Sequence, residues 1–237
     1  MGTYGGIGEI PLVAGHPALD LVNTVEPRVP GAAPVLDHLD RPVDVLVWAR
    51  RAGLMTDREA RQESAAWAAA TDDAGPDGDL GRGALEGVRA LRDALHRVLA
   101  PRAEGRAAST PEATAALGVV HAGWVEAVGR SRLRPAAPGD DPFPATCADL
   151  VIGAQPGQLL LDRVAEAAVD LLTRVDLAAL RACPPGEGGC GWLFLDRSRA
   201  RSRRWCVMED CGARAKARRL NDRRRAARAA AHDPSAR

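Results

Sequence analysis

Four of the five cysteines lie close together near the C-terminus, and their spacing is C-x6-C-x15-C-x4-C. The first pair brackets a stretch of proline and glycine that can turn and bring two thiolates to one ion. Four thiolates favour a single zinc ion in a closed structural site, which leaves no open position for catalysis. We therefore predict one structural zinc, with the ligands Cys183, Cys190, Cys206 and Cys211.

A metal is expected here because a module of about 40 residues buries too little surface to fold alone. Zinc contributes roughly 10–16 kcal/mol of coupled folding free energy to comparable modules. Two disulfides or an iron–sulfur cluster remain open as other uses of the four cysteines. Residues 192–195 and 204–205 are expected to be the two short strands of a hairpin, and a miniature core would be formed by Trp192, Phe194 and Trp205.

Arginines surround these cysteines and continue beyond them. Residues 181–237 hold 15 Lys and Arg against six Asp and Glu, whereas the other 180 residues hold 17 against 25. An acidic body joined to a basic end indicates a polyanionic partner for the basic end. The candidate nucleic-acid-binding residues are Arg197, Arg199, Arg201, Arg203, Arg204, Arg214, Lys216, Arg218 and Arg219.

The order of these arginines predicts two kinds of surface. The run DRSRARSRRW alternates arginine with other residues from Arg197 to Arg203, as along one face of an extended segment. The helix expected after Cys211 carries basic residues nearly all round, so it is exposed or binds an acidic partner. Alternatively, Arg203 and Arg204 form ion pairs with nearby acidic residues. RNA or an acidic protein also remains open as the partner of the basic surface.

The rest of the chain is expected to be a mostly helical domain. Helical spacing or capping residues predict helices at about 16–25, 41–53, 57–70, 84–99, 111–128 and 159–173, with residues 176–180 continuing helical. Residues 71–83 are expected to be a loop, and residues 150–152 a strand. Cys147 is expected to be a small buried residue. The predicted organisation is a regulatory domain over 1–178, a zinc module with a basic helix over 179–231, and a disordered tail over 232–237.

A second candidate site lies near the N-terminus. His16, Asp20 and Asn23 or Thr24 are spaced to share one face of a helix, so they could line a small-molecule pocket, with Trp48 nearby. The alternative is that Asn23 and Thr24 hold the loop that follows. His16 with Asp20 could form a base and its orienting acid. The chain lacks the GxSxG, HExxH, P-loop and dinucleotide motifs, so we do not expect an enzyme.

The sequence also restricts where the protein is found. No run of about 18 apolar residues is present, so no membrane-spanning helix is expected. The first 16 residues lack the basic start and apolar core of a signal peptide. A cytoplasmic protein is therefore expected, in which clustered cysteines are more often metal ligands than disulfides.

The C-terminal stretch C-x6-CGWLFLDRSRARSRRWCVMEDCGARAKARR resembles the zinc finger of the CGNR family. The segment GHPALDLVNTV, followed by RPVDVL, resembles the start of the ABATE domain that precedes that finger. Members of this family are thought to be stress-induced transcription regulators. The resemblance implies a treble-clef-like finger, the same four cysteine ligands, and a mainly helical N-terminal domain suspected of sensing a ligand.

Two positions depart from the family pattern. Ala213 stands where the signature CGNR has Asn, and Ala200 stands where the family tends to have Asn in the serine–arginine run. Zinc binding should survive both changes, while a base contact by either Asn would be lost. We therefore expect a mainly α protein with minor β structure that binds DNA through its zinc module. Control by a small ligand and assembly as a homodimer are further expectations.

Overall fold

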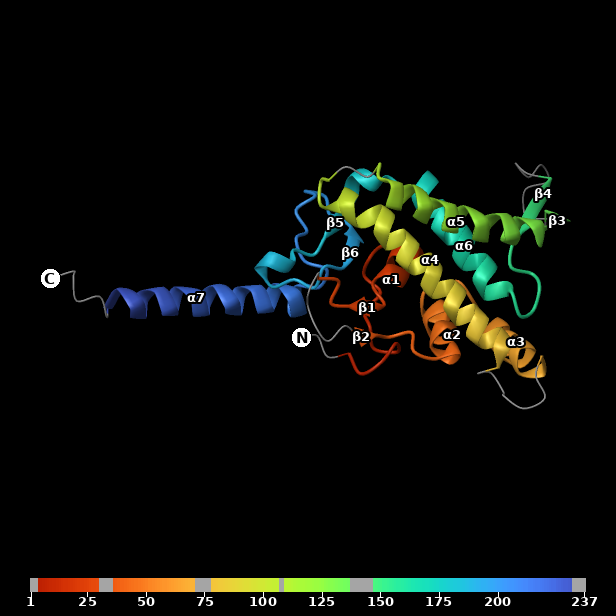
Figure 1. The fold of residues 1–237 in the computed structure, drawn as a ribbon, viewed down its shortest axis with the longest axis horizontal. Coiled ribbons are helices and arrows are strands. Elements are labelled where there is room, and N and C mark those ends of the chain that lie inside the picture. Colours follow the sequence, from red (N-terminus) through yellow and green to blue (C-terminus); the bar gives the residue numbers. More distant parts are fainter. Residues whose placement is uncertain (1–3, 30–35, 71–77, 107–108, 137–146, 232–237) are drawn as a thin grey trace.

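The computed structural model describes residues 4–29, 36–70, 78–106, 109–136 and 147–231, and side chains as far as residue 228. The fold is mainly α, as predicted, with three small two-stranded sheets among the described residues. Figure 1 shows the helices packed side by side in one body, with the C-terminal helix projecting from it. The helices are α1 (Pro17–Val22), α2 (Pro42–Arg51), α3 (Asp57–Ala69), α4 (Asp79–Ala103), α5 (Pro111–Gly129), α6 (Leu159–Arg174) and α7 (Ala213–Ala231).

The helix starts follow from local sequence. Helices α1, α2 and α5 each have proline in their first turn, where no backbone N–H is needed. Thr56 forms a capping box with Glu59 at the start of α3. Thr110 accepts a hydrogen bond from the Ala113 N–H at the start of α5.

Helix α4 is the centre of the body, because α1, α2, α3, α5 and α6 all pack against it. It begins at Asp79, five residues before the predicted start, so the end of the expected loop 71–83 is helical; residues 71–77 lie outside the described residues. Leu85, Val88, Leu91, Leu95 and Leu99 form its buried stripe, at the spacing of an amphipathic helix.

The strands pair as three antiparallel hairpins: β1 (Val25–Glu26) with β2 (Leu36–Asp37), β3 (Arg132–Pro135) with β4 (Ala148–Val151), and β5 (Leu180–Ala182) with β6 (Leu193–Leu195). The expected strand near residue 150 is β4. The expected pairing of residues 192–195 with 204–205 is wrong, since β6 pairs with β5 instead. Residues 177–179 form a short 3-10 helix (η2), and residue 180 is already in a strand, so the predicted helix 176–180 is cut short.

The hydrophobic core runs without a break through the predicted domain boundary at residue 178. The aromatic residues of the zinc module belong to this common core. Trp192 and Phe194 are almost fully buried, the indole N–H of Trp192 donates to the Val25 carbonyl, and Tyr4 stacks on Trp192. The miniature core expected from the sequence is therefore part of a larger one.

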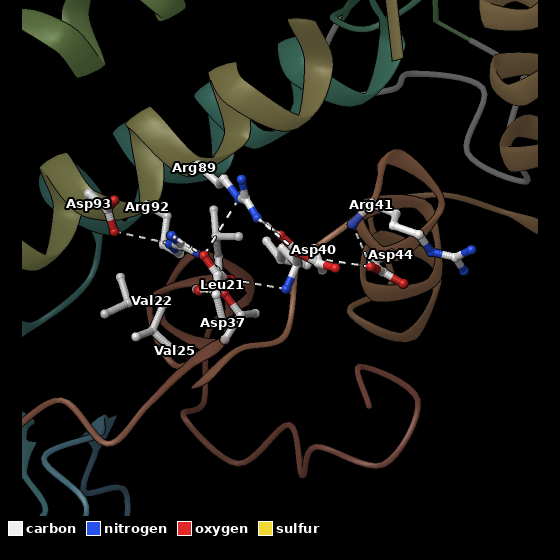
Figure 2. Close-up of polar contacts among 12 residues, drawn as sticks. Leu21, Val22, Val25, Asp37, Asp40, Arg41, Asp44, Arg89, Arg92 and Asp93 are labelled. Carbon is white, nitrogen blue, oxygen red and sulfur yellow. Dashed lines mark hydrogen bonds and ion pairs between the residues drawn. The ribbon is translucent and has the colours of Figure 1, made fainter. Parts of the chain in front are cut away.

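An ionic network fixes the β1–β2 hairpin against α4 (Figure 2). Arg92 of α4 is buried and makes two hydrogen bonds, of 2.6 and 2.9 Å, to the carboxylate of Asp37. It also bonds Asp93, while Arg89 donates to the Leu39 carbonyl. A bidentate pair of this kind is among the stronger charge-assisted hydrogen bonds, so it holds the hairpin in one orientation.

Two further sequence expectations need correction. Cys147 is exposed, at the start of the segment that leads into β4. The arginine run that was expected to be extended turns sharply at residues 198–201, where Arg201 has a left-handed φ of 46°. Asp196 is the reason for the turn, because its buried carboxylate accepts hydrogen bonds from Ser198 and from the Arg203 N–H. The predicted disordered tail 232–237 lies outside the described residues.

Candidate metal centre and basic surface

The four clustered cysteines meet at one buried point. Their sulfur atoms all lie within 4.8 Å of one another, with 3.4 Å between those of Cys190 and Cys206 and 3.6 Å between those of Cys206 and Cys211. A tetrahedral zinc with sulfur ligands at about 2.3 Å requires separations of roughly 3.8 Å. The cluster therefore fits a single zinc ion, which would be held by Cys183, Cys190, Cys206 and Cys211.

The electrostatics of the cluster also fit a cation. Hydrogen bonding from Cys190 lowers the pKa of the Cys183 thiol, whereas interaction with Cys183 raises the pKa of Cys190. Ionisation of one thiol therefore makes ionisation of the neighbouring thiol less favourable. A divalent ion removes this conflict because it binds all four groups as thiolates.

The first cysteine pair is held by a knuckle, defined here as residues 183–191, which contacts the helical body directly. The Arg28 N–H donates to the Cys190 carbonyl at 2.8 Å, and the Arg28 guanidinium bonds the Val22 carbonyl and Asp93. Gly191 has a φ of 82°, and a Cβ there would collide with the Arg28 carbonyl. The knuckle can approach the body this closely only because residue 191 is glycine.

The second pair leads directly into α7. Met208–Gly212 form a π-helix (η4) that contains Cys211 and continues as α7. A Cβ at Gly212 would collide with the Met208 side chain and crowd Trp205. Arg214 donates to the Cys211 sulfur at 2.9 Å and pairs with Asp210. The metal site therefore anchors the first turn of the basic helix.

The zinc module is hydrogen-bonded to the helical body along β6. The Asn23 side chain donates to the Leu193 carbonyl at 2.8 Å and accepts from the Leu193 N–H at 2.9 Å, as a neighbouring strand would. The Leu195 N–H donates to the Ala14 carbonyl at 2.8 Å. The β6 strand thus has partners on both edges, β5 on one and the N-terminal segment on the other.

The nine predicted nucleic-acid-binding residues fall into three groups. Arg203 and Arg214 are turned inward: Arg203 lies over Phe194 and donates to the carbonyls of Val13, Trp205 and Cys206. Arg201, Arg204 and Arg219 are exposed but form ion pairs, with Asp176 for the first and Glu187 for the other two. Among the described residues, no ion pair is formed by the remaining four: Arg197, Arg199, Lys216 and Arg218.

Helix α7 continues this basic surface away from the body (Figure 1). Every residue from Lys216 to Arg228 is exposed, and this stretch holds seven basic residues against one acidic residue, Asp222. Lys216, Arg219, Leu220 and Arg223 share one face of the helix and, with Trp205, line a hollow of about 280 Å³. The sequence predicted an exposed basic helix, and the exposure is confirmed.

The five residues predicted to line a pocket near the N-terminus do not converge. Helix α1 ends at Val22, so Asn23 is its C-cap and Thr24 lies beyond it. Asp20 accepts from the Ala14 N–H, and Thr24 donates to the Leu21 carbonyl. Trp48 is fully buried. Asn23 and Thr24 thus have structural roles, but their side chains bond Leu193 and Leu21 rather than the loop that the sequence alternative assigned to them.

Of these five residues, His16 lines a surface hollow of about 340 Å³. Its ring bonds Asp170 at 3.2 Å rather than Asp20, so the base–acid pair considered from the sequence is not formed. Burial raises the pKa of Asp20 to about 6, opposed by hydrogen bonds from Ala14 and Val13. The protonation of Asp20 is therefore linked to the segment on which the zinc module docks.

Sequence reasoning missed three contributors to the module. Tyr4 stacks on Trp192 and donates to Asp210, Arg28 holds the knuckle, and Glu187 pairs with two arginines. Only Glu187 carried a local signal, because it is the single charged residue between Cys183 and Cys190. The other two act across long sequence separations, which spacing does not reveal.

The fold and site together define a helical domain that carries a four-cysteine zinc module and a basic helix. Family models agree with this description: one for the CGNR zinc finger matches residues 180–224, and the ABATE model, described as "Putative stress-induced transcription regulator", matches residues 15–175. The second match covers more than half of the chain, which therefore belongs to the ABATE family. No curated protein matches the sequence. No helix among the described residues is long and apolar enough to cross a membrane.

Proposed function

We propose that this protein regulates transcription by binding duplex DNA through α7 and the surface of its zinc module. The observation that carries the proposal is the exposure of every side chain from Lys216 to Arg228 on a helix that projects from the body. Seven cations on such a stretch stay hydrated in the free protein, and their electrostatic free energy is most favourable next to a polyanion. Membership of a family of transcription regulators supports the same function.

The dimensions of α7 suit a DNA groove. Its 19 residues span about 28 Å, and the major groove, at about 12 Å, is wide enough to admit a helix. Because its first turn is held by Cys211 and Arg214, the helix is presented in a fixed direction. Arginine also suits this role because its planar fork can bind phosphate or guanine through two hydrogen bonds.

The test is duplex binding by the zinc-loaded full chain across a salt series. Arg218, Arg223 and Arg225, exposed and without an ion pair among the described residues, would be changed together to Gln. We expect the affinity to fall at least tenfold and the salt slope to decrease by two to three, because each lost phosphate contact removes about one unit. The matched control changes three exposed arginines of the body to Gln: Arg58, Arg61 and Arg97.

Equal losses in both triple variants would show that only net charge matters and would contradict a binding surface on α7. Failure of the zinc-loaded protein to bind at low salt would overturn the proposed function. A single-stranded RNA of the same length, measured in parallel, distinguishes DNA from RNA as the preferred partner. The homodimer expected from the sequence remains a prediction, and sedimentation equilibrium checks it.

We also propose that the function is binding rather than catalysis, with control by a small anionic ligand. The hollow beside His16 supports the ligand proposal, because Arg163 and Arg174 line it together with Glu166 and Asp170. Both arginines already have carboxylate partners, so an anionic ligand would have to share them. Arg174→Gln should weaken binding of any small anion that raises the melting temperature of the wild type. An unchanged ligand response would contradict this site.

A further inference from the structure

The carboxylate of Glu187 lies between two arginines of the basic surface. Its Oε2 accepts from Arg219 of α7 at 2.8 Å, and its Oε1 accepts from Arg204 of the loop before Cys206. The two guanidiniums come from segments on opposite sides of the second cysteine pair. They meet on one anion only because the zinc site folds both segments against the knuckle.

This arrangement has the chemistry of a phosphate site. A carboxylate that offers one oxygen to each guanidinium makes the contacts that the two free oxygens of a phosphodiester would make. Arg204 also lies over the Trp205 ring at 5.7 Å, and Arg219 and Trp205 both line the hollow beside α7. The hollow therefore joins an apolar floor to Arg219, and Arg204 adjoins it through its contact with the Trp205 ring.

We propose that Arg204 and Arg219 form a clamp for one backbone phosphate of DNA, and that Glu187 occupies this clamp in the free protein. The proposal rests on the proposed function and assigns the polyanion to particular atoms. Displacing Glu187 costs little, since its side chain is 35% exposed and those of both arginines are 55% exposed. Exposed ion pairs of this kind contribute little to stability. Glu187 thus acts as an internal competitor that lowers affinity without blocking binding.

The test compares Glu187→Gln with Glu209→Gln in the zinc-loaded full chain. Glu209 is exposed in the same module and has no ion pair among the described residues, so both variants change the net charge equally. We expect Glu187→Gln to bind a mixed-sequence 20-base-pair duplex roughly five- to tenfold more tightly than Glu209→Gln, from the loss of two exposed pairs. In a background of Arg219→Gln, most of this gain should disappear.

Equal affinities of the two glutamine variants, with binding retained, would overturn the clamp and leave the proposed function intact. Weaker binding by Glu187→Gln would also overturn it, because Glu187 would then orient the arginines rather than compete for them. Absence of binding by every form, wild type included, would overturn the proposed function and the clamp together. Zinc content and melting temperature are measured on each variant. If Glu187→Gln loses zinc, Glu187→Asp takes its place, because the shorter aspartate side chain is expected not to reach both guanidiniums. The Glu187→Asp variant should then still bind the duplex more tightly than the wild type.

Discussion

The zinc module and α7 are continuous in sequence and both contain many arginines, but the structure uses them in opposite ways. The module is packed into the helical body, where Trp192 and Phe194 join the common core and Arg203 caps that core with hydrogen bonds to three carbonyls. Helix α7 has no such packing beyond Ala215, and its side chains are exposed from Lys216 to Arg228. The burial of an arginine side chain therefore decides whether that arginine is structural or available for binding. Its neighbours in sequence do not.

The largest expected effect is that of removing the metal. If the module and the body share one core, a strong chelator should lower the free energy of unfolding by on the order of 10 kcal/mol, enough to abolish folding of most domains of this size. Thermal unfolding followed by far-ultraviolet circular dichroism would measure it, and added zinc should restore the signal. A body that melts at the same temperature without zinc would show that the two parts are independent.

The next effect concerns the side chain that joins the two parts. Asn23→Ala leaves the N–H and the carbonyl of Leu193 without their buried partners, so we expect a loss of about 3–4 kcal/mol. Urea denaturation measures the loss. Asn221→Ala on the exposed helix is the matched control and should change stability by less than about 0.5 kcal/mol. Similar values for both would contradict the docking role of Asn23.

Asp20 adds a pH dependence to the same junction. Its pKa rises from an ordinary value of 3.8 to about 6 in the folded protein, chiefly because of burial. The folded state then favours the protonated acid, so stability from this group is complete below about pH 4 and is lost as the pH rises through 6. We expect Asp20→Asn to become more stable than the wild type by up to about 3 kcal/mol between pH 4 and pH 7. A constant difference across this range would contradict the shift.

The smallest pair of effects tests the comparison itself. Arg203→Gln should cost about 2 kcal/mol, because it removes hydrogen bonds to three carbonyls and the contact with Phe194. Arg218→Gln should change stability by less than about 0.5 kcal/mol, because Arg218 is exposed. Melting temperatures of the two variants decide the matter. The same change at both positions would remove the distinction between inward and outward arginines.

The metal site could be predicted from the sequence because it depends on residue types and short-range spacing. Four cysteines near one another in a chain have few uses, so their types and spacing were sufficient to predict the zinc ligands. The exposed basic helix was readable for a similar reason, since a helix without an apolar face has nothing to bury. The expected hairpin was wrong because β-strand pairing depends on which edge is free, and β5 and the N-terminal segment take both edges of β6.

The pocket predicted near the N-terminus shows why spacing alone was insufficient there. His16, Asp20, Asn23 and Thr24 would share a face if the helix continued, but α1 ends after six residues. Each polar side chain then bonds the nearest group that burial leaves without a partner. Asn23 bonds Leu193, which is 170 positions away in the sequence, so no local pattern predicts this contact.

The sequence by itself determined the helical body, the four metal ligands and the basic character of the C-terminal helix, because each depends on composition or on short-range periodicity. Tertiary structure alone decided that the zinc module is built into the body, that Arg203 and Arg214 turn inward, and that Glu187 joins Arg204 to Arg219. These outcomes depend on which buried groups need partners and on which segments the metal draws together. Both are properties of the folded chain, since they arise only when distant residues are brought within a few ångströms of one another.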